Sequence, residues 1–197
     1  MHWGGPAEIS TVADDEVVVH HGAEVHRFVG LRPGTVHDLD GLEVRTLDWP
    51  GGELLCRFAT VNDVHFGEVE CGRIDGSDAG PILRSAPGEP PYPEIMNAAA
   101  VEELTALDPV AVIAKGDLTN DGTAEEYGRF LEVWHGAFGD RLHHVRGNHD
   151  AMAGQPFGTE GIPKCVVLPG VWAAVLDTVR PGSERGQLDA SQLEWLD

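Results

Sequence analysis

The sequence predicts an α/β fold preceded by a small β-rich segment. From Leu54 onwards, short apolar runs alternate with segments of helical period, a pattern typical of strands and helices that share one sheet. Before that point, residues 1–52 show short β-like runs separated by glycine, proline and aspartate turns, without a helical period. Three polar motifs in the second segment each follow an apolar run. Each is therefore expected on the loop just past a strand end, where sites assemble in open α/β sheets.

The first segment, residues 1–52, is predicted to be a small β-rich domain. Its candidate strands are Glu16–His20, Glu24–Val29 and Leu42–Leu47. The stretch Leu31-Arg32-Pro33-Gly34-Thr35-Val36-His37 resembles the corner of a fibronectin type III-like domain, with His37 where a tyrosine is usual. A complete sandwich needs about 100 residues, so the segment is interpreted as a possible remnant of such a domain. Pro50-Gly51-Gly52 is the expected hinge.

The second segment, residues 53–197, begins with an expected strand over Leu54–Val61. The glycine- and proline-rich stretch Phe66–Pro90 is expected to be a long loop, and its length points to a functional role. A helix is expected from about Tyr92 to Leu107, because prolines stand at its start and apolar residues recur at helical spacing. Its apolar face is expected to consist of Met96, Ala99, Ala100, Leu104 and Leu107.

A further strand is expected over Val110–Ala114, and Thr123 with Glu126 forms a capping box that begins the next helix. An aromatic stripe on this helix is expected to pack in the core, because its members recur at helical spacing. The stripe consists of Tyr127, Phe130, Leu131, Trp134 and Phe138. The remaining expected strands are Leu142–Val145, Lys164–Leu168 and Val171–Leu176.

The last residues carry another helix start. Asp189 with Gln192 forms a second capping box, and Leu188 with Leu193 could form the accompanying hydrophobic staple. The printed sequence ends at Asp197, after roughly two turns, and an isolated helix of that length is marginal. We therefore expect the second domain to be incomplete at its C-terminus.

The three polar motifs are Asp63-Val64-His65, Gly116-Asp117-Leu118-Thr119-Asn120 and Gly147-Asn148-His149-Asp150. Together they offer carboxylate, amide and imidazole donors, a set that suits divalent metal ions. Asp63 and His65 stand two residues apart, so their side chains are expected to point the same way and chelate one cation. Asp117 has two oxygens and could bridge two ions, while Asn148 could hold the second. His149 would then be the catalytic general acid.

Each motif alone is also compatible with an ordinary turn, because glycine, asparagine and aspartate favour turns. Their joint occurrence, each after an apolar strand, favours the metal site. His143 and His144 are interpreted as structural, although one of them could lie near the site. Arg73, Arg84 and Arg146 are candidate anion contacts, against a default of solvated surface arginine, and Arg146 is the one assigned to substrate.

Charge excludes some functions. The chain has 33 acidic and 13 basic residues, and a formal net charge of −20, which repels nucleic acid and anionic lipid. A small phosphate ester remains compatible, because bound cations reverse the local charge. No apolar run approaches the roughly 20 residues that span a bilayer. Three scattered cysteines and the absence of a secretory signal at the printed start favour a cytoplasmic location.

Over about Leu54–Asp197, the three motifs resemble the opening signature of the calcineurin-like metallophosphoesterase superfamily. The stretch Gly116–Gly122 is most similar to its cyclic-nucleotide phosphodiesterase-like bacterial branch. The resemblance implies an αββα sandwich, here cut short after the first sheet, with a dinuclear centre at one end of the sheets. It also implies manganese, iron or zinc as the metals and hydrolysis of a phosphodiester or phosphomonoester. Its implied ligands are Asp63 and His65 for the first ion, Asp117 as the bridge and Asn148 for the second, with His149 catalytic.

The family completes its site with a later histidine and a Gly-His-x-His segment, whereas no histidine follows His149 here. We therefore expect the chain to carry only part of the site, with weak metal binding and little or no hydrolysis on its own. The upstream histidines His20, His21, His26 and His37 could substitute in principle, although they lack the family's spacing. The alternative is a catalytically incompetent fragment or an interaction module whose unpaired sheet edge invites a partner. Substrate, metal and oligomeric state are left open.

Overall fold

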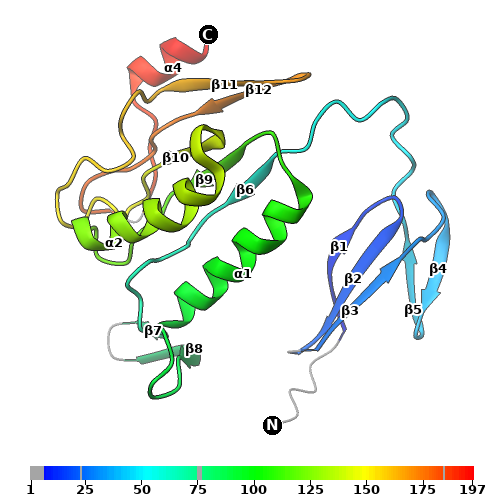
Figure 1. Cartoon of the computed structure of the whole chain (residues 1–197). Coiled ribbons are helices and arrows are strands. Elements are labelled where there is room, and N and C mark those ends of the chain that lie inside the picture. The colour runs from blue at the N-terminus through cyan, green and yellow to red at the C-terminus, as the bar shows by residue number, and fades with distance from the viewer. Residues whose placement is uncertain (1–6, 23, 75–76, 184) are drawn as a thin grey trace. The chain divides into compact units, whose positions relative to one another are not determined.

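The structure is a computed structural model that describes residues 7–22, 24–74, 77–183 and 185–197, with the backbone alone over 73–81. The chain divides into two compact units, Met1–Glu53 and Leu54–Asp197. Figure 1 shows antiparallel strands in the first unit and a mixture of strands and helices in the second. Among the described helices, none is both long enough and apolar enough to cross a membrane.

The first unit consists of two small antiparallel sheets. One has the order β1-β2-β3 and the other pairs β4 with β5. Their bounds are β1 Glu8–Val12, β2 Glu16–His21, β3 Glu24–Val29, β4 Val36–Leu39 and β5 Leu42–Arg45. Val17, Val19, Leu39 and Val44 form the core. The His37 ring nitrogen Nε2 lies 3.0 Å from the backbone oxygen of Arg32, as a corner residue would. A fibronectin-like origin stays a prediction.

The second unit is built on a three-stranded parallel sheet of order β10-β9-β6. The strands are β6 Ala59–Val61, β9 Val112–Lys115 and β10 Leu142–Val145. Residues of β9 alternate between the two faces of the sheet, as the period of a strand requires. Val112 and Ala114 pack against helices, whereas Ile113 packs against the hairpin β11 Lys164–Leu168 and β12 Val171–Val175. The sheet is therefore covered on both faces.

Helices α1 Tyr92–Leu107 and α2 Ala124–Phe130 lie on the same side of this sheet (Figure 1). The capping box of Thr123 and Glu126 is formed as predicted. The expected apolar face of α1 is confirmed for Ala100 and Leu104, whereas Ala99 is exposed and Met96 and Leu107 are 65% and 53% exposed. The helix also buries Pro93 and Asn97 and packs Ala100, Val101 and Leu104 against the core. The α1 bounds match the prediction.

The helix with the aromatic stripe is not uniform. After α2 the backbone forms a π-helical turn over Leu131–His135, then short helices α3 Gly136–Phe138 and η2 Gly139–Arg141. Phe130, Trp134 and Phe138 are buried as expected. A π turn adds a residue to the ring closed by each hydrogen bond, which re-aims the side chains that follow it.

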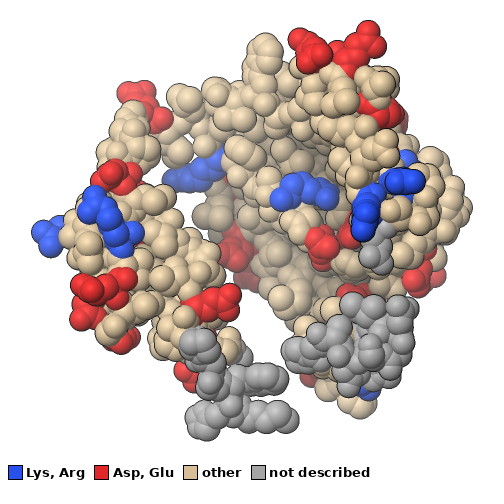
Figure 2. Space-filling model, turned by 180° about the vertical axis from the view of Figure 1, so that it is seen from behind, with Lys and Arg blue, Asp and Glu red and all other residues tan. Residues whose placement is uncertain are grey.

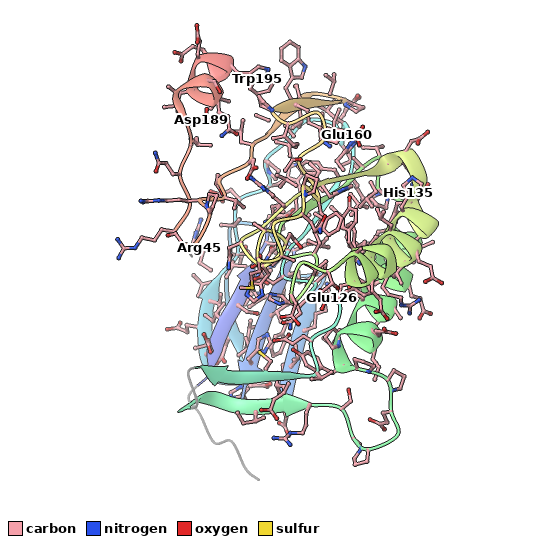
Figure 3. All side chains as sticks on the ribbon, turned by 90° about the vertical axis from the view of Figure 1, so that its left-hand side faces the viewer. Arg45, Glu126, His135, Glu160, Asp189 and Trp195 are labelled. Atoms are coloured by element: carbon pink, nitrogen blue, oxygen red, sulfur yellow. The ribbon has the colours of Figure 1, made fainter. Side chains whose placement is uncertain are left out.

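Three other expectations need correction. The stretch Phe66–Pro90 contains a hairpin, β7 Glu70–Ile74 and β8 Ser77–Arg84, and the strand expected from Leu54 covers only Ala59–Val61. Helix α4, Ala190–Leu196, begins after Asp189, whose carboxylate accepts the Gln192 backbone N–H. The Gln192 side chain does not complete the capping box. It bonds the backbone of Asp177 instead. Asp189 and Trp195 of this region are labelled in Figure 3.

Candidate metal centre

The three polar motifs lie at one rim of the parallel sheet. Asp63-Val64-His65 follows β6, Gly116-Asp117 follows β9 and Gly147-Asn148-His149 follows β10. Because these neighbouring strands are parallel, their carboxyl ends meet at the same edge, where α/β proteins bind ligands. The sheet topology therefore brings residues from three distant sequence positions together.

Side chains of His65, Asp117 and His149 form a compact group at this rim. Each offers one ligand atom, and these atoms all lie within 4.8 Å of one another. The His65 Nε2 atom is 3.9 Å from Asp117 Oδ2, and the two imidazole rings meet edge to face at 4.6 Å. The side chains of His65 and Asp117 are 17% and 16% exposed. The group is accessible but largely surrounded by protein.

The backbone under this group adopts an unusual conformation. Asp63, His65 and Asp117 all have positive φ, at 55°, 42° and 50°. For residues with a Cβ this left-handed conformation is strained, and it persists only where the surroundings enforce it. Here two motifs bond to each other: Asp63 N–H donates to the Gly116 carbonyl at 3.2 Å, and His65 N–H donates to the Asp117 carbonyl at 3.0 Å. The β6 and β9 loops therefore hold one another in place.

Asp150 fixes the third motif to the second. This carboxylate is fully buried and accepts hydrogen bonds from the backbone N–H groups of Leu118, Thr119 and Gly147 and from the Thr119 hydroxyl, at 2.6–3.1 Å. A buried carboxylate with four donors is well satisfied, and removing it would leave all four without a partner. Sequence reasoning assigned Asp150 no role, although it is the last residue of the third motif.

Gly147 is required by the close approach of Asp117. A Cβ at position 147 would lie 2.1 Å from Asp117 Oδ1 and 2.3 Å from the Asp117 backbone nitrogen. Rotating the Asp117 side chain would not relieve the contact between the added Cβ and the Asp117 backbone nitrogen. Any residue larger than glycine at position 147 must therefore displace this loop. The glycine thus makes room for the carboxylate that the site needs.

The imidazole of His149 is oriented by two contacts. Its backbone N–H donates to Asp117 Oδ1 at 3.0 Å, and its Nδ1 atom lies 2.7 Å from the Asn120 carbonyl oxygen. A carbonyl only accepts, so Nδ1 carries the proton. In the neutral ring, Nε2 is then the basic nitrogen, able to bind an ion or to take up a proton.

A buried network supports the first motif from behind. Asn97 on α1, only 5% exposed, donates from Nδ2 to the Val64 carbonyl at 2.9 Å and to the Pro93 carbonyl at 2.7 Å. Its Oδ1 accepts the indole N–H of Trp134, which lies in the π-helical turn, at 2.8 Å. Val64 is the central residue of Asp63-Val64-His65, so Asn97 anchors the loop that carries both predicted ligands.

The remaining predicted site residues lie around this group, and their roles stay predictions. Asp63 is 60% exposed, with Oδ1 3.7 Å from His65 Nε2, and it accepts a hydrogen bond from Asn62. Asn148 lines a separate hollow with Met152 and Arg180.

The arginines predicted as anion contacts are paired with carboxylates where their side chains are described. Arg146 donates to Asp177 at 2.7 Å, so its guanidinium already has an anionic partner. Arg84 pairs with Glu70 at 2.7 Å, and the side chain of Arg73 lies outside the described residues. Any contact between these arginines and a substrate stays a prediction.

His144 belongs to the core beside the site. Its Nε2 lies 2.7 Å from the Tyr127 hydroxyl, and its ring meets Phe130 edge to face. Burial lowers the pKa of His144 to about 4 and also lowers the pKa of His143, with the charge of Lys164 acting in the same direction. Both imidazoles are neutral near pH 7, in keeping with the structural interpretation.

The donor set of His65, Asp117 and His149 fits a divalent ion. Two imidazoles and a carboxylate are ligands that manganese, iron and zinc accept. The His65 Nε2 atom faces two carboxylates, at 3.7 Å from Asp63 Oδ1 and 3.9 Å from Asp117 Oδ2, so nitrogen and oxygen donors are close enough to share an ion. The backbone around the group is also held rigidly, as a preorganised site requires.

Comparisons with known proteins agree with this geometry. A family profile described as calcineurin-like phosphoesterase matches residues 56–181, the stretch that contains all three motifs. A cAMP/cGMP dual specificity phosphodiesterase from Mycobacterium tuberculosis (strain CDC 1551 / Oshkosh) is 32% identical over an alignment of 102 residues, and the match covers 47% of this chain. The chain covers 32% of the length of that relative.

Proposed function

The chain belongs to the calcineurin-like phosphoesterase family, and on that premise we propose that it takes part in the metal-dependent hydrolysis of a phosphate ester. The observation that carries this proposal is the meeting of His65, Asp117 and His149, from three sequence motifs, at one rim of the sheet. Neither the β-rich first unit nor the hairpin β11–β12 contributes to this group.

The proposed centre is dinuclear. Asp63 and His65 would hold the first ion, Asp117 would bridge, and Asn148 would hold the second, with manganese, iron or zinc as the metals. The two carboxylate oxygens of Asp117 face His149 N–H and His65 respectively, a placement that supports a bridging role. Divalent ions bound there supply charge stabilisation to the phosphoryl oxygens and lower the pKa of a water nucleophile. The proposed fold around this rim is the αββα sandwich that the family resemblance implies, with the rim at one end of its sheets.

His149 is proposed as the general acid rather than as a metal ligand, because its single free nitrogen, Nε2, cannot bind an ion and carry a proton at the same time. Its Nδ1 proton is engaged by the Asn120 carbonyl, so the proton to be transferred would be held at Nε2, on the opposite side of the ring. From there it would pass to the oxygen of the departing alkoxide, which cannot leave readily as an anion. The short Asn120 contact fixes the direction in which that proton points.

The proposed substrate is a small phosphate ester rather than a nucleic acid. The net charge of −20 opposes long polyanions, and on the face drawn in Figure 2 the basic residues stand apart from one another rather than forming one basic area. The name of the mycobacterial relative supports a phosphodiester. Free thiols at Cys56, Cys71 and Cys165 support a cytoplasmic location.

The test is hydrolysis of bis(p-nitrophenyl) phosphate with increasing Mn²⁺, by the chain and by its Asp117→Asn and His149→Ala variants. We expect slow turnover, because the chain carries only part of the ligand set expected around two ions. Turnover that rises with Mn²⁺ and disappears in Asp117→Asn supports the proposal. Turnover that is independent of Mn²⁺, or equal in the Asp117→Asn variant, contradicts it.

A second candidate function is a binding or interaction module that retains the phosphoesterase fold without catalysis. It is favoured by the absence of histidine among residues 150–197, where the family resemblance expects further ligands. Mn²⁺ binding without any turnover, together with a stable dimer in size-exclusion chromatography, would favour this candidate over hydrolysis.

A further inference from the structure

A pocket of about 570 Å³ lies directly beside the candidate metal centre. Asp63 and His65 form one end of its wall, and Tyr92, Met96 and Ala100 of α1 form another part. Leu83 of the β7–β8 hairpin closes a further side. The volume falls in the range of small-molecule sites, about 300–1,000 Å³. His65 belongs to both the pocket wall and the metal group, so the pocket and the candidate metal centre adjoin at this residue.

The wall of this pocket disfavours negative charge. No lysine or arginine is among its described lining residues, while Asp63 and Glu68 contribute carboxylates. A phosphoryl group or another anion therefore gains nothing there. The pocket is distinct in this respect from the metal group, where cations would attract a phosphoryl group.

Two polar side chains of the wall, Asn97 and Tyr92, already have partners. Asn97 uses its amide on Val64, Pro93 and Trp134, and the Tyr92 hydroxyl donates to Glu68. Burial beside Glu68 raises the pKa of Tyr92, so the phenol is neutral. What the wall offers to a ligand is thus mainly apolar surface, from Met96, Leu83, Ala100 and the ring of Tyr92.

Two large apolar side chains at this pocket are exposed to water. Met96 is 65% exposed and Leu83 is 53% exposed. Covering such side chains stabilises a complex, because apolar area is removed from water. Methionine also adapts its shape to flat rings and makes favourable contacts with them.

We infer that this pocket receives the organic group of the phosphate ester, and that this group is an uncharged aromatic or heterocyclic ring. The inference rests on the proposed function, because it places the phosphoryl group of the same molecule at His65, Asp117 and His149. The pocket then favours esters of ring-bearing alcohols, because the ring covers its apolar wall. Esters of small polar alcohols would leave that wall exposed to water.

The experiment compares two phosphonates that cannot be hydrolysed, at a pH above the second pKa of both, where each is a dianion. Affinities of phenylphosphonate and methylphosphonate are measured by calorimetry on the chain after its Mn²⁺ binding has been recorded. We expect phenylphosphonate to bind about tenfold more tightly, the equivalent of about 1.4 kcal/mol. In Met96→Glu this ratio should fall to about one. In Ile95→Glu it should persist, because Ile95 is also exposed on α1 but does not line the pocket.

Equal affinities for the two phosphonates, or a ratio that survives in Met96→Glu, would overturn the inference. So would a loss of the ratio that is just as large in Ile95→Glu, because the effect would then be independent of the pocket. Since both ligands carry the same charge, a general electrostatic effect of the new glutamate cancels in the ratio. Failure to bind Mn²⁺ at all would contradict the proposed function and overturn the inference with it. Mn²⁺ binding with equal affinities for the two phosphonates would overturn only the assignment of this pocket to the organic group.

Discussion

Aspartates with a left-handed backbone occur at both ends of the parallel sheet, but their surroundings differ. At the amino end, Asp108 has φ 46° and terminates helix α1, while its exposed carboxylate accepts from Arg141 at 2.9 Å. At the carboxyl end, Asp63 and Asp117 have φ 55° and 50°. There the strained backbone is held by cross-loop hydrogen bonds and by the buried carboxylate of Asp150. A left-handed aspartate is an ordinary helix stop at one end and part of a candidate metal centre at the other.

The comparison indicates that the partners of a residue, rather than its own conformation, distinguish a site from a turn. At the amino end a single exposed ion pair suffices. At the carboxyl end, several buried hydrogen bonds fix the conformation of each loop. They thereby hold the side chains of the candidate metal centre in one geometry, as a preorganised site requires. Changes at the carboxyl end should therefore cost stability and metal affinity together, whereas changes at the amino end should cost little of either.

The largest effect is expected from Asp150→Asn. The amide cannot accept from all four donors that now bond the carboxylate, so buried N–H groups lose their partners. We expect a loss of about 4 kcal/mol in the free energy of unfolding and a weaker Mn²⁺ affinity. Urea denaturation followed by circular dichroism measures the first. The control Asp140→Asn, at an exposed carboxylate, should change stability by less than about 0.5 kcal/mol; equal effects would break the comparison.

The next effect is pH dependence through His144, which packs just before the carboxyl end of β10. Its pKa is about 4 in the folded chain, against about 6.5 when unfolded. Between these values the unfolded chain binds more protons, so stability falls as pH drops from about 6.5 to about 4, by up to about 3 kcal/mol. Above pH 6.5 this contribution is constant. Urea midpoints across that range should fall less in His144→Gln than in the parent chain, and an identical fall would contradict the assignment.

A smaller effect is expected from Asn97→Leu, which removes the support behind Asp63-Val64-His65. The Val64 carbonyl and the Trp134 indole N–H lose their partner, at a cost of about 2 kcal/mol. Mn²⁺ affinity should fall as the strained loop relaxes. In the double variant Asn97→Leu with Trp134→Phe, the loss in free energy of unfolding should be smaller than the sum of the two single losses. The reason is that phenylalanine has no indole N–H to leave without a partner. Strict additivity in this double-mutant cycle would count against the network.

The smallest effect is expected from Arg141→Ala at the amino end. Its ion pair with Asp108 is exposed, its bond to the Pro109 carbonyl is part-buried, and exposed ion pairs contribute roughly 0–1 kcal/mol. Stability should change by less than about 1 kcal/mol and Mn²⁺ affinity should not change. A drop in Mn²⁺ affinity comparable with that of Asp150→Asn would show that the two ends are not independent.

Sequence patterns predicted the strands β9 and β10, helix α1 and the Thr123 capping box well, because apolar periodicity and capping chemistry are local properties. They predicted the face of α1 only in part, because burial of Asn97 depends on a carbonyl and an indole from elsewhere in the chain. The β7–β8 hairpin was missed since glycine and proline are as typical of loops as of hairpin turns.

The candidate site was predicted unevenly for the same reason. Motif order after apolar strands indicated that His65, Asp117 and His149 would share a rim, and the structure brings them together. Asp150 was missed because a turn-forming aspartate and a buried four-fold acceptor look alike in sequence. The π-helical turn that aims Trp134 leaves no simple pattern either. Whether Asp63, Asn148 and Arg146 act as assigned stays a prediction.

The central claim is tested most directly by locating a bound Mn²⁺ through its paramagnetic effect on histidine ring signals in NMR spectra. The chain has ten histidines, four of them in the upstream group His20, His21, His26 and His37. At substoichiometric Mn²⁺, the ring signals of His65 and His149 should broaden first, and Asp117→Asn should abolish this selectivity. Broadening that begins at the upstream histidines, or that spares His65 and His149, would contradict a metal centre at the rim of the parallel sheet.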